Sequence, residues 1–126
     1  MDFECYGKDH KEFHTDKLSE LQKAHEIYEL EFVFEDGDKK YVECDLKPYR
    51  PKDLEDANKH NRLVDFLKGF YGCDVVFVRH LEETDDYWCP YDITFGFYVV
   101  KNDIVEKFIS DEYANGLFDG VMSCKE

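Results

Sequence analysis

Positively charged residues are scarce in this chain of 126 residues, and their scarcity excludes one broad class of function. The chain has 16 Lys and Arg against 30 Asp and Glu, giving a formal net charge of −14 and an isoelectric point near 4.6. Such an excess of negative charge repels DNA, RNA and anionic membranes. We therefore expect no direct binding of nucleic acid and no membrane binding, and we expect any strong partner to be basic.

Long apolar runs are missing as well. Uninterrupted runs of aliphatic and aromatic residues, such as Val75–Val78, are far too short to cross a bilayer. The first residues, Met1–Glu4, are not basic and no apolar run follows them, so a signal peptide is not indicated. These features predict a cytoplasmic protein, located in the host cell if a phage encodes it.

Cysteine occurs in a pattern that argues against a disulfide framework. The five cysteines are widely spaced, their number is odd, and no Cys-x-x-Cys is present. This pattern predicts a reduced protein with mostly buried thiols. His10 and His14 are four residues apart, but no complementary Cys–His pair accompanies them. We expect no metal site and no cofactor.

None of the common catalytic motifs is present, whether a phosphate-binding glycine loop, His-Glu-x-x-His or a nucleophile elbow. Asp45-Leu46-Lys47 could be the carboxylate–lysine pair of a metal-dependent nuclease, but strand alternation alone explains its spacing. His80 near Glu82 and Glu83 could be a general base, although a histidine on a buried strand is more often structural. We predict no catalytic residues and no enzymatic activity.

The composition supports a folded core, because 43% of the residues are hydrophobic and 17% are aromatic. The length predicts a single domain over residues 1–126. Helical spacing of apolar residues occurs over 15–27, 53–70 and 103–114, and alternation typical of strands occurs over 29–35, 39–47, 73–81 and 91–101. This order predicts an α+β fold with an antiparallel sheet built from two β-hairpins and helices packed on one face.

The ends of the predicted helices carry their own signals. Asp53 and its acidic neighbours fit the helix dipole at the start of the central helix, so we exclude them from any binding patch. Asp103-Ile104-Val105-Glu106 fits a capping box at the start of the last helix, which Asn115-Gly116 would end. Residues 117–126 are expected to form an irregular tail, and residues 1–14 a short strand or a packed arm.

The strongest local signal is the hairpin from Glu29 to Lys47 around Asp36-Gly37. A three-residue loop, Asp36 to Asp38, keeps the apolar residues of both strands on one face. That register predicts two pairs of opposed carboxylates, Glu31 with Glu43 and Glu29 with Asp45. Like charges directly opposite each other destabilise a sheet. The acidic face is therefore either a solvated surface that discourages edge association or a patch for a basic partner.

Two separate acidic sets are candidates for partner binding. The first lies on the hairpin and its tip: Glu29, Glu31, Glu35, Asp36, Asp38, Glu43 and Asp45. The second follows the strand at 73–81: Glu82, Glu83, Asp85 and Asp86. Paired strands can present carboxylates at spacings similar to those of DNA phosphates. Tyr41, Tyr87 and Trp88 would supply apolar anchors, because aromatic residues concentrate interface energy.

One segment also resembles a known family. Tyr98-Val99-Val100, followed by Ile104–Ser110 and Asn115-Gly116, is similar to the strand-to-helix segment of small acidic phage anti-CRISPR proteins that inhibit Cas9. The resemblance covers Tyr98–Gly116 and implies an α+β fold whose carboxylates imitate DNA at the basic site that reads the PAM. In that family an acid-rich stretch follows the helix, whereas Leu117–Met122 follows here. The contact residues of the family therefore map to no position of this chain.

These observations lead to one main hypothesis and its alternatives. The chain is expected to be an acidic inhibitor that binds the basic nucleic-acid-binding surface of a target protein by DNA mimicry. An anti-CRISPR protein acting on a CRISPR effector nuclease is one form of this hypothesis. An immunity protein that neutralises a nuclease toxin would use the same physics. A small metal-dependent, nuclease-like enzyme and an acidic scaffold domain are the remaining alternatives, and the sequence leaves the oligomeric state open.

Overall fold

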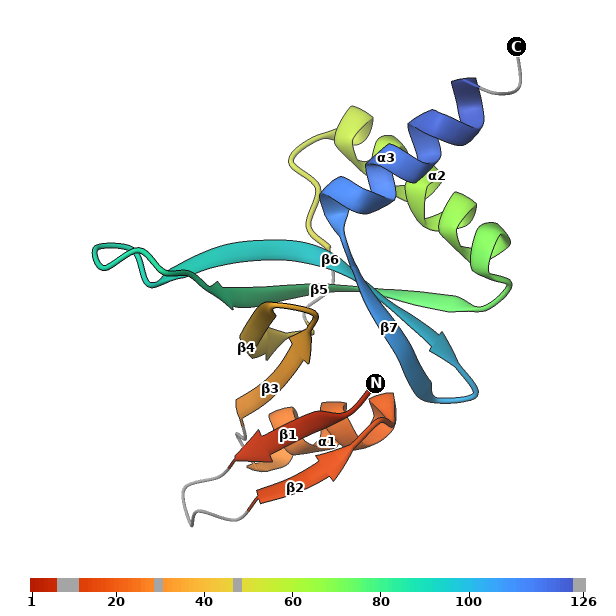
Figure 1. Ribbon diagram of the computed structural model, residues 1–126. Helices are drawn as coiled ribbons and strands as arrows, with labels where there is room; N and C mark the ends of the chain where they lie inside the picture. The colour runs from red at the N-terminus through yellow and green to blue at the C-terminus, as the bar shows by residue number, and fades with distance from the viewer. Residues whose placement is uncertain (7–11, 29–30, 47–48, 124–126) are drawn as a thin grey trace.

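The computed structural model describes residues 1–6, 12–28, 31–46 and 49–123, which form one seven-stranded antiparallel sheet and three helices (Figure 1). The strands follow the order β2-β1-β3-β4-β5-β6-β7 across the sheet. The elements are β1 (Phe3–Tyr6), β2 (Glu12–Thr15), α1 (Leu18–Tyr28), β3 (Glu31–Asp36), β4 (Lys39–Asp45), α2 (Leu54–Tyr71), β5 (Asp74–Glu83), β6 (Tyr91–Lys101), β7 (Ile104–Ser110) and α3 (Asp111–Ser123). The predicted α+β class is confirmed, although the sheet has more strands than two hairpins supply.

The sheet buries apolar side chains on both of its faces. Phe97 belongs to the core cluster that contains Leu67 of α2, whereas the next residue, Tyr98, belongs to the cluster that contains Leu21 of α1. Successive residues of a strand point to opposite faces, so the two clusters lie on opposite sides of β6. The prediction that all helices pack on one face is therefore wrong: α1 lies on one face, and α2 and α3 lie on the other (Figure 1). Strands that are apolar on both faces require cover on both.

The predicted register of the β3–β4 hairpin is wrong. Asp36 pairs with Lys39, so the turn is the two residues Gly37 and Asp38, and Gly37 takes a positive φ of 64° that suits a tight hairpin. This register places Phe34 opposite Tyr41, and their buried rings stack with centroids 4.9 Å apart. Because the two-residue turn buries both aromatic rings on the same face, it is favoured over the three-residue loop.

The corrected register also changes which charges face each other. Glu35 lies opposite Lys40, and Asp36 lies opposite Lys39, so this end of the hairpin pairs opposite charges. Glu31 lies opposite Tyr6 of β1. The predicted pairing of Glu31 with Glu43 is therefore wrong, because Val33 rather than Phe32 is the partner of Val42.

The helix predicted over residues 103–114 is also wrong. Ile104–Ser110 forms β7, and Asp111–Ser123 forms α3, so the segment predicted as an irregular tail is mostly helical. Phe108 and Ile109 are both buried but belong to different core clusters. Adjacent residues that point to opposite faces are typical of a strand, and here both faces are covered. Asn115-Gly116 lies inside α3 instead of ending a helix. Residues 98–116 thus comprise the end of β6, the strand β7 and the first turns of α3, where a strand followed directly by a helix was expected.

Asp103 does cap a helix, although not the one predicted. With Asn102 it forms the β6–β7 turn, in which both residues have positive φ, 53° for Asn102 and 68° for Asp103. Its carboxylate accepts hydrogen bonds from the backbone N–H of Ser19, at 2.9 Å, and from the Ser19 hydroxyl. Its carbonyl accepts from the N–H of Leu18 at 2.8 Å. The first turn of α1 is therefore capped by a residue 84 positions further along the chain.

The other predicted elements agree with the structure within a few residues. The central helix is α2, where Asp53 accepts a hydrogen bond from Asp56 N–H at 2.7 Å as the N-cap. Gly72, in the left-handed conformation, follows its last turn. The predicted strand over 91–101 coincides with β6. These segments were predictable because caps, periodicity and length all indicate the same element.

Candidate functional site

The β5–β6 hairpin is the most prominent projection of the molecule (Figure 1). Its strands pair without interruption from Asp74–Val100 to Glu83–Tyr91. The loop at the far end is closed by a hydrogen bond from Thr84 N–H to the Pro90 carbonyl, 2.8 Å long, and Asp86 accepts another from Trp88 N–H at 2.9 Å. The loop therefore has a defined conformation, and it holds Tyr87 and Trp88 88% and 86% exposed.

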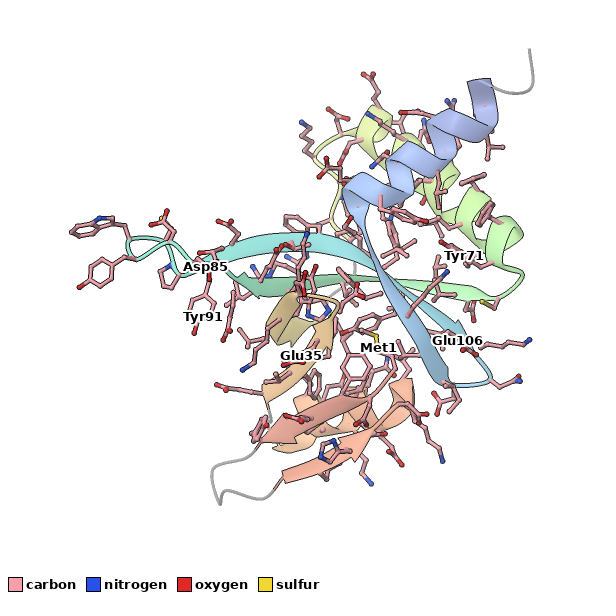
Figure 2. The ribbon with its side chains drawn as sticks, viewed as in Figure 1. Met1, Glu35, Tyr71, Asp85, Tyr91 and Glu106 are labelled. Atoms are coloured by element: carbon pink, nitrogen blue, oxygen red, sulfur yellow. The ribbon has the colours of Figure 1, made fainter. Side chains whose placement is uncertain are left out.

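An uncovered apolar stripe connects this loop to the body of the protein. Tyr91, Ile93 and Phe95 alternate along β6 and are each roughly half exposed. Phe97 and Val99 continue the same face and are buried in the cluster formed with α2 and α3. The stripe is thus the part of the α2/α3 face of the sheet that lies beyond the helices. Figure 2 shows Tyr91 and Asp85 on the projecting part of the hairpin.

The structure brings together the two acidic sets that the sequence analysis treated as separate. Lys39 forms an ion pair with Glu82 at 3.6 Å, and Lys40 forms one with Glu83 at 4.0 Å. These contacts place the β3–β4 turn beside the base of the β5–β6 loop. The exposed acidic residues of this combined region, which we call the hairpin-tip surface together with Tyr87 and Trp88, are Glu35, Asp36, Asp38, Glu83, Asp85 and Asp86.

Not every predicted residue belongs to this surface. Glu82 is partly buried, pairs with Lys39 and accepts a hydrogen bond from Thr94 at 3.0 Å, so its role is structural. Glu31 is exposed but lies at the other end of β3. Glu29 lies outside the described residues, as do the side chains of Glu43 and Asp45. Tyr41 is 3% exposed, so its prediction as an interface anchor is wrong.

Charge is distributed unevenly over the hairpin-tip surface. The carboxylates near the β3–β4 turn have Lys39 and Lys40 among them, which offset part of their charge. Asp85 and Asp86, in contrast, form no ion pair with any residue that the structure describes. Exposed aromatic rings and uncompensated carboxylates therefore coincide in the β5–β6 loop.

His80, the other sequence candidate, is a core residue. It is 1% exposed, and its Nε2 lies 2.8 Å from the Tyr98 hydroxyl. The rings of Phe34 and Phe108 contact its imidazole edge-on, with centroids 4.7 and 5.0 Å away. These surroundings are typical of a structural histidine.

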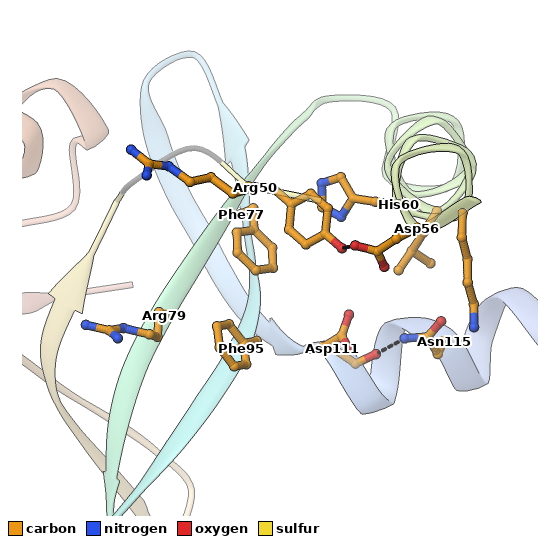
Figure 3. A pocket seen from close by; sticks show the side chains of 11 residues that line it. Arg50, Asp56, His60, Phe77, Arg79, Phe95, Asp111 and Asn115 are labelled. Atoms are coloured by element: carbon orange, nitrogen blue, oxygen red, sulfur yellow. Dashed lines mark hydrogen bonds between the residues drawn. The ribbon is translucent and has the colours of Figure 1, made fainter. Parts of the chain in front are cut away.

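A cavity of about 720 Å³ that no sequence pattern predicted lies beside α2, α3, β5 and β6 (Figure 3). Its lining is formed by Tyr49, Arg50, Asp56, Lys59, His60, Leu63, Phe77, Arg79, Phe95, Asp111 and Asn115. Tyr49 stacks on His60 with ring centroids 3.8 Å apart and donates a hydrogen bond to Asp56. The lining residues come from five segments, each with a local explanation, and no short motif connects them.

Burial changes the protonation of the groups that line the cavity. It lowers the pKa of His60 from its ordinary 6.5, against the opposing effect of Asp111 and Asp56. It raises the pKa of the Asp111 carboxyl above 3.8. The hydrogen bond to Asp56 is the main cause that raises the pKa of Tyr49 to about 12. Burial therefore favours the neutral form of both His60 and Asp111.

Within residues 1–6, 12–28, 31–46 and 49–123, His, Cys, Asp and Glu side chains form no group of three or more that could hold a metal ion. None of the helices in the described part of the chain is long and apolar enough to cross a membrane. Comparisons with protein-family models, with curated proteins and with solved structures found no match. Any functional interpretation therefore depends on the geometry of the hairpin-tip surface and the cavity.

Proposed function

We propose that the protein binds a basic, nucleic-acid-handling protein through its hairpin-tip surface and thereby competes with nucleic acid. The observation that carries this proposal is the pair Tyr87 and Trp88, almost fully exposed beside Asp85 and Asp86 on a loop with its own hydrogen bonds. Exposed aromatic residues contribute little to the stability of the free protein, but they are the side chains that most often dominate binding energy.

The shape of the hairpin supports insertion into a groove of the partner. The projecting strands would enter the groove, and the stripe of Tyr91, Ile93 and Phe95 would pack against its apolar wall. Asp85 and Asp86 would meet the Lys and Arg side chains that otherwise contact phosphates. The net charge of −14 would increase the association rate by steering the two proteins together.

The partner class follows from this charge complementarity. A CRISPR effector nuclease and a nuclease toxin both present basic grooves that a projecting acidic hairpin could occupy. Inhibition by occupying the groove needs no catalytic group on this chain. The proposal therefore includes the anti-CRISPR and the immunity-protein forms of the hypothesis, and it differs from the enzyme and scaffold alternatives by requiring a basic partner.

The first test is a pull-down from bacterial lysate that has been treated with nuclease to remove bridging nucleic acid. We expect the wild-type protein to retain a basic nucleic-acid-binding protein at low salt and to retain less at high salt. The double variant Tyr87→Ala/Trp88→Ala and the double variant Asp85→Asn/Asp86→Asn should both lose it. A matched control, Glu55→Gln/Asp65→Asn, removes the same charge from exposed positions of α2 and should retain the partner.

A second measurement uses the single tryptophan of the chain. Addition of the purified partner should shift the Trp88 fluorescence to shorter wavelength, because the exposed indole becomes buried, and excess nucleic acid should reverse the shift. Retention of the partner by the Tyr87→Ala/Trp88→Ala variant, or equal losses in the α2 control, would contradict the proposal. So would a wild-type protein that retains no basic protein.

A further inference from the structure

The cavity beside α2 and α3 is chemically unlike the rest of this acidic chain. Two of its lining residues are arginines, Arg50 and Arg79, and a third cation, Lys59, lies on α2. Its volume of about 720 Å³ falls within the range of roughly 300–1,000 Å³ that is typical of small-molecule sites. The residues that carry the proposed function, Tyr87 and Trp88 with Asp85 and Asp86, do not line it.

Charged side chains line two sides of this cavity, with two arginines on one side and Asp111, near Lys59, on the other. Figure 3 shows Arg50 and Arg79 on one side, Phe77 and Phe95 in the middle, and Asp111 on the side of the helices. Arg50 is exposed and forms no hydrogen bond or ion pair with any described residue. Its guanidinium is therefore available to donate hydrogen bonds to an anionic group of a ligand. A bound molecule would have an anion at one end and hydrogen-bond donors at the other.

The middle of the cavity offers a flat aromatic surface. The rings of Phe77 and Phe95 are stacked at 16°, with centroids 5.8 Å apart. Phe95 lines the cavity and is roughly half exposed, so part of its ring is open to contact. Planar heterocycles stack on such rings without requiring specific hydrogen bonds. The aromatic middle of the cavity therefore favours a ligand with a flat ring.

Asp111 is the carboxylate best placed to accept hydrogen bonds from that ring. The carboxylate of Asp56 already accepts from the Tyr49 hydroxyl and from Lys52 N–H at 3.3 Å. Asp111, half-buried at the start of α3, faces the cavity beside Asn115. An ionised carboxylate only accepts, so it suits an edge with two neighbouring N–H donors. Guanine has such an edge, whereas adenine places an acceptor next to its amino group.

We propose that the cavity binds a nucleoside phosphate and that it favours guanine. The phosphate contacts Arg50, the base stacks on Phe95, and the two N–H groups of the guanine edge donate to Asp111. A single nucleotide carries little charge compared with a nucleic-acid strand, so this site is compatible with a chain that repels DNA and RNA. The site shares Phe95 with the apolar stripe, but its binding of a nucleotide does not require a partner protein.

The test is a calorimetric titration of the full chain with GMP, AMP, guanosine and inorganic phosphate. We expect GMP to saturate one site at millimolar concentration or below, and guanosine and inorganic phosphate to bind at least about tenfold more weakly. Arg50→Gln should weaken GMP by at least about tenfold and leave guanosine unchanged. Asp111→Asn should abolish the preference for GMP over AMP. The control Arg62→Gln removes the same charge from an exposed position of α2 outside the cavity and should bind like the wild type.

Three results would overturn the assignment. One is the failure of GMP to saturate a site on the wild-type protein at millimolar concentration. Another is an affinity for GMP that Arg50→Gln leaves unchanged, or that Arg62→Gln reduces equally. The third is a preference for GMP over AMP that survives Asp111→Asn. Denaturant unfolding of each variant will distinguish a loss of binding from a loss of folding.

Discussion

Gly96 gives the sharpest test of how the β6–β7 pair is packed. It lies opposite Ser110 of β7, and a Cβ atom at this position would lie 2.3 Å from the Ile109 carbonyl oxygen and 2.6 Å from a ring carbon of Phe108. A phenyl ring can rotate, but the carbonyl belongs to the strand that pairs with β6. Gly96→Ala therefore requires β6 and β7 to separate, and it cannot be accommodated by a side-chain change alone.

The expected cost follows from this geometry. Overpacking of a well-packed interior costs about 1–3 kcal/mol, and a clash with backbone belongs at the upper end, about 3 kcal/mol. With a urea m-value of about 2 kcal/mol per M, the midpoint of unfolding should fall by roughly 1.5 M. The assay is urea unfolding followed by circular dichroism, because its far-UV signal reports the whole sheet.

Gly116 provides a control of opposite sign. It lies inside α3, and a Cβ atom there has no heavy atom within 4 Å. Gly116→Ala should stabilise the protein by up to about 1 kcal/mol, because alanine loses less conformational entropy in a helix. A Gly96→Ala variant within about 0.5 kcal/mol of the wild type would refute the close approach of β7. If Gly96→Ala and Gly116→Ala destabilise the protein equally, the loss at Gly96 cannot be attributed to its packing against β7.

Three further predictions concern the core, the cap and the cavity. Tyr98→Phe removes the hydrogen bond to His80 while keeping the buried ring, so the unfolding free energy should fall by about 1 kcal/mol, and an unchanged urea midpoint would contradict this. Asp103→Ala should lower the melting temperature more than Asp103→Asn, since asparagine keeps an acceptor for Ser19 and tolerates the positive φ; equal melting temperatures would show that α1 does not need this cap. Because burial raises the native pKa of Asp111, the folded state holds that proton more tightly than the unfolded chain, so this residue adds stability as the pH falls toward 3.8. The difference in unfolding free energy between wild type and Asp111→Asn should therefore shift in favour of the wild type on acidification, and a shift in the other direction would refute the assignment.

The elements that could be predicted from sequence are those with redundant local signals. Asp53 as the N-cap and Gly72 after the last turn delimit α2, and alternation over eleven residues defines β6. The segment Ile104–Ser110 was predicted incorrectly because Ile104 and Phe108 fit a helical spacing as well as a strand. What decides between the two is long-range: Ile109 packs with α2 and α3, while Phe108 packs on the opposite face. No local pattern contains that information.

The candidate site was predictable in its residue types and unpredictable in its arrangement. Asp85 and Asp86 with Tyr87 and Trp88 are adjacent in the chain, so their exposure in one loop could be expected from sequence. The pairing of Lys40 with Glu83, which joins the two acidic regions, depends on the β4–β5 register across the intervening helix α2. The cavity depends on α2 and α3 lying over the same strands, and Asp56 was assigned to the helix dipole alone.

The cap that Asp103 provides to α1 has a consequence for synthesis of the chain. The apolar residues around Phe3 and Leu21 are covered in part by Tyr98, Val105 and Phe108, which a ribosome adds much later. The first third of the protein therefore leaves the ribosome without the cap of α1 and with only part of its core. Contacts between distant parts of the sequence slow folding, so the N-terminal segment should acquire its final structure only after β6 and β7 have been synthesised. During translation, its N-terminal segment is the part most exposed to chaperones and proteases.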